Sequence, residues 1–356
     1  MAAGSSFPSS RALVPVTLVV LLGLVLAACS ASGDSPLPVQ ASPVVSAASS
    51  ALPSPTATPS ASASPSPAAI PSPVERTATV AASIPLGGHG TRMALGDGSV
   101  WVRFADGNVA RVDTKTGKVG KKIPVGTGEF GSLAVGDGAV WVTTFDENKV
   151  SRIDPATNKV VAEIAVGTNP EGITVTPEAV WVSNHRAGSI SRIDPATNTV
   201  VATITFGRDG PSGPKDIKIS NGSLWTSVPN LGSVIRIDQA TNEVLAKIRV
   251  ENVEDLVAGS ETVYAYGAKG LYEIDPASNE VVRTIKPGQG PWMFADGAYW
   301  GSDGKDILRL APDTFYPIER LRIPGTESGY ADLAIGDGSA WVMTEDGTLL
   351  RVDLSE

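Results

Sequence analysis

A motif that recurs seven times constrains this chain more than any other feature of its sequence. Successive copies lie 40, 40, 44, 39, 36 and 41 residues apart. Each copy is marked by an aromatic residue in a short apolar segment: Trp101, Trp141, Trp181, Trp225, Tyr264, Trp300 and Trp341. A period near 40 residues, built from short β-patterned segments, is typical of a propeller or another repeat array.

The repeat at residues 131–167 shows how each unit is expected to fold. It contains four short segments rich in β-branched and apolar residues, at residues 133–135, 140–143, 150–154 and 160–166. Turn-forming residues separate these segments, with Asp137 and Gly138 in the first turn and Pro155 in the last. Four antiparallel strands per repeat make a propeller blade. We therefore predict an all-β fold, a seven-bladed β-propeller of four-stranded antiparallel blades.

The repeated residues themselves are best explained as structural. We expect the Trp of each repeat to fill the space between neighbouring twisted sheets. The Asp of the recurring Arg-x-Asp, as in Arg152-Ile153-Asp154, is expected to begin a turn. Seven equivalent positions around a ring cannot all be catalytic.

The two ends of the repeat region predict how the ring closes. The last repeat stops near Asp353, just after its third strand, so it lacks a fourth. Residues 80–86 precede the first repeat and have the pattern of a fourth strand. An open array would need polar capping repeats, and the sequence shows none. We therefore expect residues 80–86, including Ile84, to pair beside Val352 and close the propeller.

The first 78 residues are predicted to lie outside the propeller. Residues 1–28 have one charge and an apolar run too short to span a membrane, which is typical of a signal peptide. They end in Leu-Ala-Ala before Cys29, the only cysteine, which resembles a bacterial lipoprotein signal. Residues 29–78 then form a lipidated Cys and a disordered Ser/Pro/Ala-rich stalk, and residues 79–356 form the propeller. A plain secretory signal is the alternative.

Composition limits the partners. The formal net charge is −9, which argues against nucleic acid and anionic lipid as partners, because both need a basic face. A single cysteine excludes an intrachain disulfide, so packing must supply the stability. We expect a monomer outside the cytoplasm, tethered to the bacterial membrane through a lipid on Cys29.

The repeats resemble those of a known class. Residues 153–175 and 193–204, with Ile-Asp-Pro-Ala-Thr-Asn followed by Val-Val-Ala-x-Ile, are similar to YVTN and NHL propellers and to the virginiamycin B lyase-like group. The resemblance implies a seven-bladed propeller. Members of such families include binding proteins, scaffolds, lyases and lactonases, so it leaves the function open.

The irregular links between blades predict where a site would lie. Aligning the repeats at the start of the first strand places seven residues at one mouth of the channel: Arg92, Ser132, Gly172, Asp216, Asp255, Trp292 and Asp332. Arg92, Asp216, Asp255, Trp292 and Asp332 are the candidate ligand-binding rim. The alternative is a set of solvated loop charges, with Trp292 packed into the channel top.

Both histidines fall in links of the same face. His185 and His89 are candidate acid–base groups, since histidine titrates near neutral pH. The lyase-like resemblance implies a His and a metal-binding carboxylate, but no residue spacing identifies a metal site. No cofactor is predicted, although a divalent cation could bind at the mouth.

Two main functions follow from these features, with cofactor-dependent redox chemistry as a third. The first is a binding or scaffold module whose irregular face holds a protein, peptide, glycan or small molecule. The alternative is a lyase or lactonase that uses His185 or His89 together with a divalent cation. An enzyme would need a histidine and a carboxylate within about 3–7 Å in one cleft at the mouth.

Overall fold

The computed structural model describes residues 72–128, 130–206, 213–259, 261–286, 291–326 and 329–354. These residues belong to one compact unit, Ser66–Glu356. The expected signal peptide, Cys29 and the stalk up to residue 71 lie outside the described residues, as does the link at residues 207–212. Those expectations therefore remain predictions.

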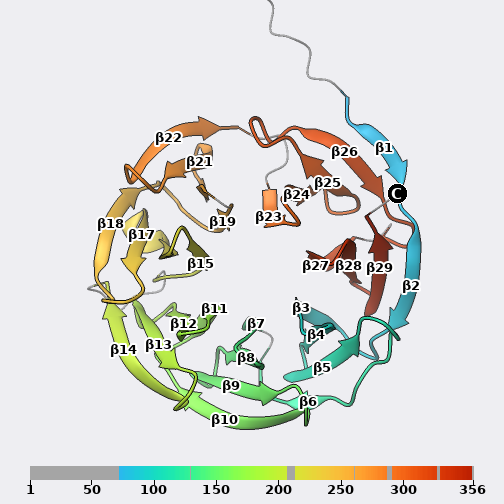
Figure 1. Cartoon of the computed structure of the whole chain (residues 1–356), viewed down its shortest axis with the longest axis horizontal. Coiled ribbons are helices and arrows are strands. Elements are labelled where there is room, and N and C mark those ends of the chain that lie inside the picture. Colours follow the sequence, from blue (N-terminus) through green and yellow to red (C-terminus); the bar gives the residue numbers. More distant parts are fainter. Residues whose placement is uncertain are drawn as a thin grey trace, which may run out of the picture. The chain divides into compact units, whose positions relative to one another are not determined.

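Seven β-sheets stand around a central axis, as Figure 1 shows, and this confirms the predicted propeller. The four strands that make up each blade run antiparallel, and the first strand of each blade lies nearest the axis. The described residues contain one helical turn, the 3-10 helix η1 (Pro229–Leu231). None of their helices has the length and apolar character needed to cross a membrane.

The strands of the first four blades follow the order of the sequence. Blade one contains β3 (Gly90–Gly96), β4 (Ser99–Phe104), β5 (Asn108–Asp113) and β6 (Ile123–Pro124). Blade two contains β7 (Leu133–Gly136), β8 (Ala139–Thr144), β9 (Lys149–Asp154) and β10 (Lys159–Ala165). Blade three contains β11 (Pro170–Thr176), β12 (Ala179–Asn184), β13 (Ser189–Asp194) and β14 (Thr199–Thr205). Blade four contains β15 (Ile217–Ser220), β16 (Ser223–Val228), β17 (Ser233–Asp238) and β18 (Val244–Arg249).

The last two blades each take a strand from the N-terminal side of the unit. Blade five contains β19 (Leu256–Ala258), β20 (Val263–Gly267), β21 (Gly270–Asp275) and β22 (Glu280–Ile285). Blade six contains β23 (Pro291–Ala295), β24 (Ala298–Ser302), β25 (Ile307–Leu310) and β26 (Pro317–Arg322), with β1 (Val74–Thr77) outermost. Blade seven contains β27 (Tyr330–Gly336), β28 (Ser339–Thr344) and β29 (Thr348–Asp353), with β2 (Val80–Pro85) outermost.

The turns form where the sequence predicts them. Asp137 and Gly138 have φ values of 51° and 64°, so both central residues of the first turn of blade two lie in the left-handed region. Two positive φ values in a two-residue turn match the twist of the flanking strands. In the last turn Asn158 has a φ of 53°, a conformation that Asn tolerates better than most residues.

The repeated aromatic residues lie between the blades. Trp101, Trp141, Trp181 and Trp225 are fully buried. The buried apolar residues form seven clusters, and each cluster joins one blade's aromatic residue to the next blade. Trp141 of blade two, for example, packs against Ile173 and Val182 of blade three. The hydrophobic core is thus divided among the seven interfaces of the ring.

An arginine fastens the outer side of most interfaces. The Arg152 guanidinium lies 4.9 Å from the Trp141 ring centroid and donates 2.9 Å to Asn198 Oδ1 in the next blade. Arg111, Arg192, Arg236 and Arg351 likewise cover their own Trp and donate to a turn of the following blade. The Arg of Arg-x-Asp is therefore an inter-blade hydrogen-bond donor as well as a cation over an aromatic ring.

Blade five has no arginine at this position, but an arginine from another strand makes the hydrogen bond to the next blade. Glu273 occupies the Arg position, and Arg283 of β22 bonds to it at 2.6 Å. The same guanidinium donates to the carbonyl of Asp313 in blade six at 2.5 Å. The link to the next blade is kept although the motif is lost.

The N-terminal strand closes the ring as predicted. In β2, Val80 pairs with Val352 and Ile84 pairs with Leu349 of β29, in antiparallel register. The amide of Leu86 continues the ladder by donating 2.9 Å to the carbonyl of Gly347. The first and last parts of the propeller are therefore hydrogen-bonded in one sheet.

The propeller also includes part of the segment that was expected to be a disordered stalk up to residue 78. Val74–Thr77 forms β1, a fifth strand that runs parallel to β26 on the outer edge of blade six. Arg76 pairs with Glu319 at 2.5 Å across this contact. Four residues with no equivalent in the other repeats offer no periodic pattern, so the sequence did not reveal the strand.

The buried aromatic residues give a direct test of this packing. Trp141→Ala should lower the free energy of unfolding by about 3–5 kcal/mol, the usual cost of emptying a buried Trp site. Val161→Ala in β10 is a matched control, because Val161 is 55% exposed. It should change the stability by less than about 0.5 kcal/mol. Urea unfolding measures both; equal effects of the two substitutions would contradict the assigned packing.

Candidate functional site

A cavity of about 610 Å³ lies where the links enter the first strands of blades one to five. It is lined by Thr91, Arg92, Phe130, Gly131, Ser132, Phe145, Glu171, Gly172, His185, Lys215, Asp216 and Asp255. These residues come from the irregular face on which the sequence placed the site. Lining residues of opposite charge and two aromatic rings distinguish this cavity from the regular turns of the other face.

A side-chain hydroxyl that recurs in three blades fixes the backbone of charged residues at the cavity. Two residues after the Trp, blades two, three and four carry Thr143, Ser183 and Ser227. Each hydroxyl donates to a carbonyl in the link that enters the next blade, namely that of Glu171 (3.1 Å), Lys215 (2.6 Å) and Glu254 (2.6 Å). The fold therefore holds three successive charged residues at one level of the mouth.

Gly172 allows this close approach between blades. A Cβ atom at Gly172 would lie 2.6 Å from the carbonyl oxygen of Lys215 and 2.9 Å from Ser183 Oγ. Any side chain would push the link away from blade three. The glycine at this rim position is thus required by packing, and its neighbour Glu171 supplies the chemistry.

Blade one uses a buried arginine in place of the hydroxyl, and this builds an aromatic wall. Arg103 is fully buried and donates to the carbonyls of Gly128 (3.0 Å) and Phe130 (2.9 Å). Phe130 is 66% exposed, and its ring centroid lies 5.8 Å from that of Phe145. The two rings form an apolar wall of the cavity, and the hydrogen bonds from Arg103 hold the backbone of the loop that carries Phe130.

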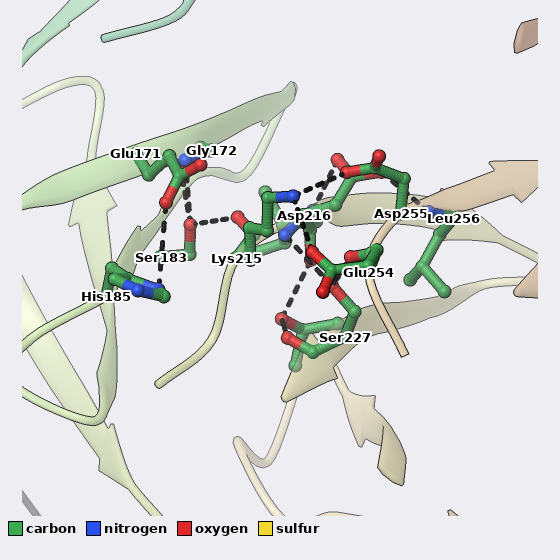
Figure 2. A network of polar contacts seen from close by, with 12 residues as sticks. Glu171, Gly172, Ser183, His185, Lys215, Asp216, Ser227, Glu254, Asp255 and Leu256 are labelled. Carbon is green, nitrogen blue, oxygen red and sulfur yellow. Dashed lines mark hydrogen bonds and ion pairs between the residues drawn. The ribbon is translucent and has the colours of Figure 1, made fainter. Parts of the chain in front are cut away.

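A second part of the cavity lining carries a histidine and a carboxyl group. His185 Nδ1 lies 3.7 Å from Glu171 Oε2, as Figure 2 shows. Burial raises the pKa of Glu171 above its ordinary value, and the nearby His185 and Lys215 oppose this only in part. A carboxyl group of raised pKa beside a histidine in one cavity is an arrangement typical of acid–base sites.

Lys215 joins this pair to a second acidic group. Its Nζ lies 2.9 Å from Glu254 Oε2 and 3.4 Å from Asp255 Oδ1 (Figure 2). Burial alone would lower the pKa of Lys215, but the hydrogen bond to Glu254 and the charge of Asp255 raise it above its ordinary value. The ammonium group stays charged and holds the links of blades four and five together.

Two of the predicted rim carboxylates connect blades. Asp216 Oδ2 accepts from the amide of Leu256 in blade five at 2.9 Å, and its other oxygen accepts from Lys218 at 2.9 Å. Asp332 Oδ2 accepts from the amide of Met93 in blade one at 2.8 Å. Burial raises the pKa of Asp332, which the bond from Met93 partly offsets. These carboxylates are engaged in equivalent inter-blade hydrogen bonds.

The structure thus brings together some of the predicted site residues. Arg92, Asp216, Asp255 and His185 line the cavity. His89 is exposed, with Nδ1 3.3 Å from the carbonyl of Glu345, and it does not line the cavity. The backbone of Trp292 lies in β23, and its side chain is outside the described part of the structure.

Several residues of the site were not predicted, among them Glu171, Lys215, Phe130 and Phe145. Glu171 and Lys215 directly precede the aligned rim positions, and Phe130 comes two residues before Ser132. Alignment to a single position per repeat missed them, because hydroxyls or Arg103 fix the backbone just before that position. The change from a hydroxyl residue to Arg103 was visible in the sequence and could have indicated a special loop.

A metal site was left open by the sequence. Within the described ranges, no group of three or more His, Cys, Asp or Glu side chains is arranged to hold a metal ion. Lys215 and Lys218 instead lie against the carboxylates of Asp255 and Asp216.

Comparisons with known proteins support the fold. The family described as "Domain of unknown function (DUF5074)" matches residues 75–215, and no curated protein matches the chain. The virginiamycin B lyase of Staphylococcus aureus superposes with a TM-score of 0.63 and 17% identity, covering 77% of this chain and 98% of that one. A streptogramin B lyase gives 0.62 and 18%, covering 76% and 96%.

A third structure is a catalytically inactive virginiamycin B lyase from Staphylococcus aureus with quinupristin. It has a TM-score of 0.62 and 17% identity, and covers 77% of this chain and 98% of that one. The chain therefore has the seven-bladed fold of these lyases. At this level of identity the likeness establishes the fold and leaves the activity to the site.

The raised pKa of Glu171 predicts how stability depends on pH. The folded chain keeps this proton to higher pH than the unfolded chain does. The free energy of unfolding should therefore fall as pH rises through the interval between the pKa of Glu171 in the unfolded chain and its pKa in the folded chain. Glu171→Gln should be more stable than wild type above the interval and equal to it in acid. Glu280→Gln, which removes an exposed charge from β22, is the control. Urea unfolding across pH tests this, and parallel pH profiles of wild type and Glu171→Gln would refute it.

Proposed function

We propose that the propeller is a binding module whose cavity takes a small amphipathic molecule or a short peptide. The observation that carries this is the pairing of an exposed aromatic wall with a charged wall in one cavity. Phe130 and Phe145 offer apolar contact, while Glu171, His185 and Arg92 offer hydrogen bonds and charge. Ligand sites typically combine apolar surface with a few convergent polar groups.

The two walls favour a ligand with two unlike ends. An apolar or aromatic group of the ligand would stack on Phe130, an exposed aromatic of the kind that dominates binding energies. An amine or another donor would face Glu171 and Asp255, and an anionic group would face Arg92. A protein or glycan partner that presents such groups would use the same cavity.

We also propose that the module is displayed outside the cytoplasm on a lipid tether. This rests on the sequence of the leader, on Cys29 as the only cysteine, and on the Ser/Pro/Ala composition of the stalk. The tether would begin at the outer edge of blade six, where β1 joins the propeller.

Ligand screening with matched variants tests the binding proposal. A thermal-shift screen of aromatic amines and dipeptides, followed by calorimetry, should find ligands that bind with one-to-one stoichiometry. Phe130→Ala and His185→Ala should each weaken binding about tenfold or more, a loss of about 1.4 kcal/mol. Lys247→Gln, on the exposed outer strand of blade four, should leave affinity unchanged. Ligands that bind equally to all four proteins would show that the cavity is not their site.

A lyase or lactonase activity is the second candidate, favoured by the 3.7 Å separation of His185 and Glu171. This separation lies within the range of about 3–7 Å expected for an acid–base histidine and carboxylate in an enzyme. The fold is also that of lyases. A neutral His185 could accept a proton from a substrate, and the Glu171 carboxylate would stabilise the resulting imidazolium. Arg92 could stabilise negative charge that develops on an oxygen atom.

Quinupristin is the defined probe for this second candidate. Ring opening of an ester by elimination leaves the mass unchanged, whereas hydrolysis adds one water, so mass spectrometry with chromatography distinguishes the two reactions. Conversion should fall at least about a hundredfold in His185→Ala, in the range expected for loss of an acid–base group, and persist in His89→Ala. Reactions with added Mg²⁺ and with EDTA test the divalent cation. Unchanged quinupristin in every reaction would count against a lyase of this specificity and leave the binding proposal intact.

A further inference from the structure

The outer edge of blade one differs from every other blade in the described part of the chain. Its fourth strand, β6, has two residues, whereas the outermost strands of the other blades have four to seven. Residues 114–122 replace the missing strand length with coil along the rim, as Figure 1 shows. Gly120 lies within this segment, and Gly weakens a strand.

This irregular edge carries a concentration of lysines in an acidic protein. Lys115, Lys118, Lys121 and Lys122 are all exposed, and residues 114–126 contain no Asp or Glu. Lys159 of blade two is exposed beside them. Lys121, Lys122 and Lys159 line one hollow of about 630 Å³ between the two blades. We call these five residues the lysine edge.

Little within the chain neutralises the lysine edge. Lys122 pairs with Asp106 at 2.7 Å and lies 4.3 Å from the Phe104 ring centroid. For Lys115, Lys118, Lys121 and Lys159, the described residues include no carboxylate within ion-pair distance.

The nearest turn carboxylates are engaged by their own turns. Asp113 accepts from Thr116, and Asp154 accepts from Thr157. Hydrogen bonds from those turns lower the pKa of both groups, so they remain ionised and fixed in place. The four lysines without a carboxylate within ion-pair distance in the described residues are therefore available to an anionic partner outside the chain.

We propose that the lysine edge docks on an anionic membrane surface. The charges are spread along a rim of the propeller, which suits a plane of lipid headgroups better than a single bound anion. Each lysine near such a surface contributes about fivefold in affinity, which is weak for a free protein. A tether at Cys29 would hold the propeller within roughly 140 Å of the membrane and raise its effective concentration there.

Docking by this edge would orient the cavity. Because the blades radiate from the channel axis, contact at an outer rim lays that axis parallel to the membrane. The mouth lined by His185 and Glu171 would then open sideways, along the surface, and stay accessible to ligands. The net charge of −9 argued against anionic lipid, but it averages over the chain and conceals this local excess of lysine. The proposal does not depend on what the cavity binds.

Vesicle binding tests the lysine edge separately from the lipid. The chain without its predicted signal peptide, carrying Cys29→Ser so that it has no acyl group, is mixed with vesicles of phosphatidylcholine alone or with phosphatidylglycerol. We expect binding only to the anionic vesicles, weakened by added salt. The variant Lys115→Gln, Lys118→Gln, Lys121→Gln, Lys159→Gln should lose on the order of several hundredfold in affinity, given about fivefold for each of the four lysines. Lys122 is left in place because it packs on Phe104.

A second quadruple variant controls for overall charge. Lys247, Lys269, Lys286 and Lys305 are exposed lysines of blades four to six, and their replacement by Gln removes the same charge. It should keep most of the binding, and unchanged thermal unfolding would show that both variants fold. Equal loss in both variants, or equal binding to neutral vesicles, would overturn the proposal. So would binding to soluble polyphosphate without binding to anionic vesicles, because it would identify a phosphate polymer as the partner.

Discussion

The contact between the aromatic residue of one blade and the sheet of the next is the interaction on which the rest of the structure depends. A four-stranded blade cannot bury its own faces, so each of the seven apolar clusters belongs to two blades at once. The Arg that covers the Trp also donates a hydrogen bond to a turn of the next blade. This directional bond adds to the buried apolar area in holding the two blades together. Blade five keeps this link with Arg283 although its own motif is lost, which shows that the contact matters more than the motif.

The site depends on a second hydrogen-bonded link between blades, which starts from blades two, three and four. Thr143, Ser183 and Ser227 each hold the carbonyl of a residue that enters the next blade. The backbone there is repetitive while the side chains are not, so Glu171, Lys215 and Glu254 can differ without loss of the fold. Arg103 extends the same principle, because a longer donor at the hydroxyl position supports a different loop and exposes Phe130. Function in this propeller thus lies in residues that a repeated hydrogen bond positions.

The ring and its closure were predictable from the sequence because they depend on periodic, local signals. The aromatic spacing, the turn residues and the pairing of β2 with β29 all follow from patterns within about 40 residues or at the two ends. The site was predictable only in part: Arg92, Asp216, Asp255 and His185 line the cavity, but Glu171, Lys215 and Phe130 were missed. Asp332 was assigned to the rim by alignment, yet its carboxylate is buried against the amide of Met93.

The sequence by itself determined the number of blades, the order of strands within each, and the joining of the two ends. These features follow from the spacing of apolar residues and from turn residues, which act over short stretches of the chain. Only the tertiary structure decided which charges meet. His185 and Glu171 lie in different links, Lys215 reaches carboxylates of the next blade, and Lys159 adjoins lysines of the preceding one. Those encounters depend on the twist and spacing of neighbouring sheets, which place residues some 15 to 40 positions apart in contact. No pattern within a single repeat contains that information.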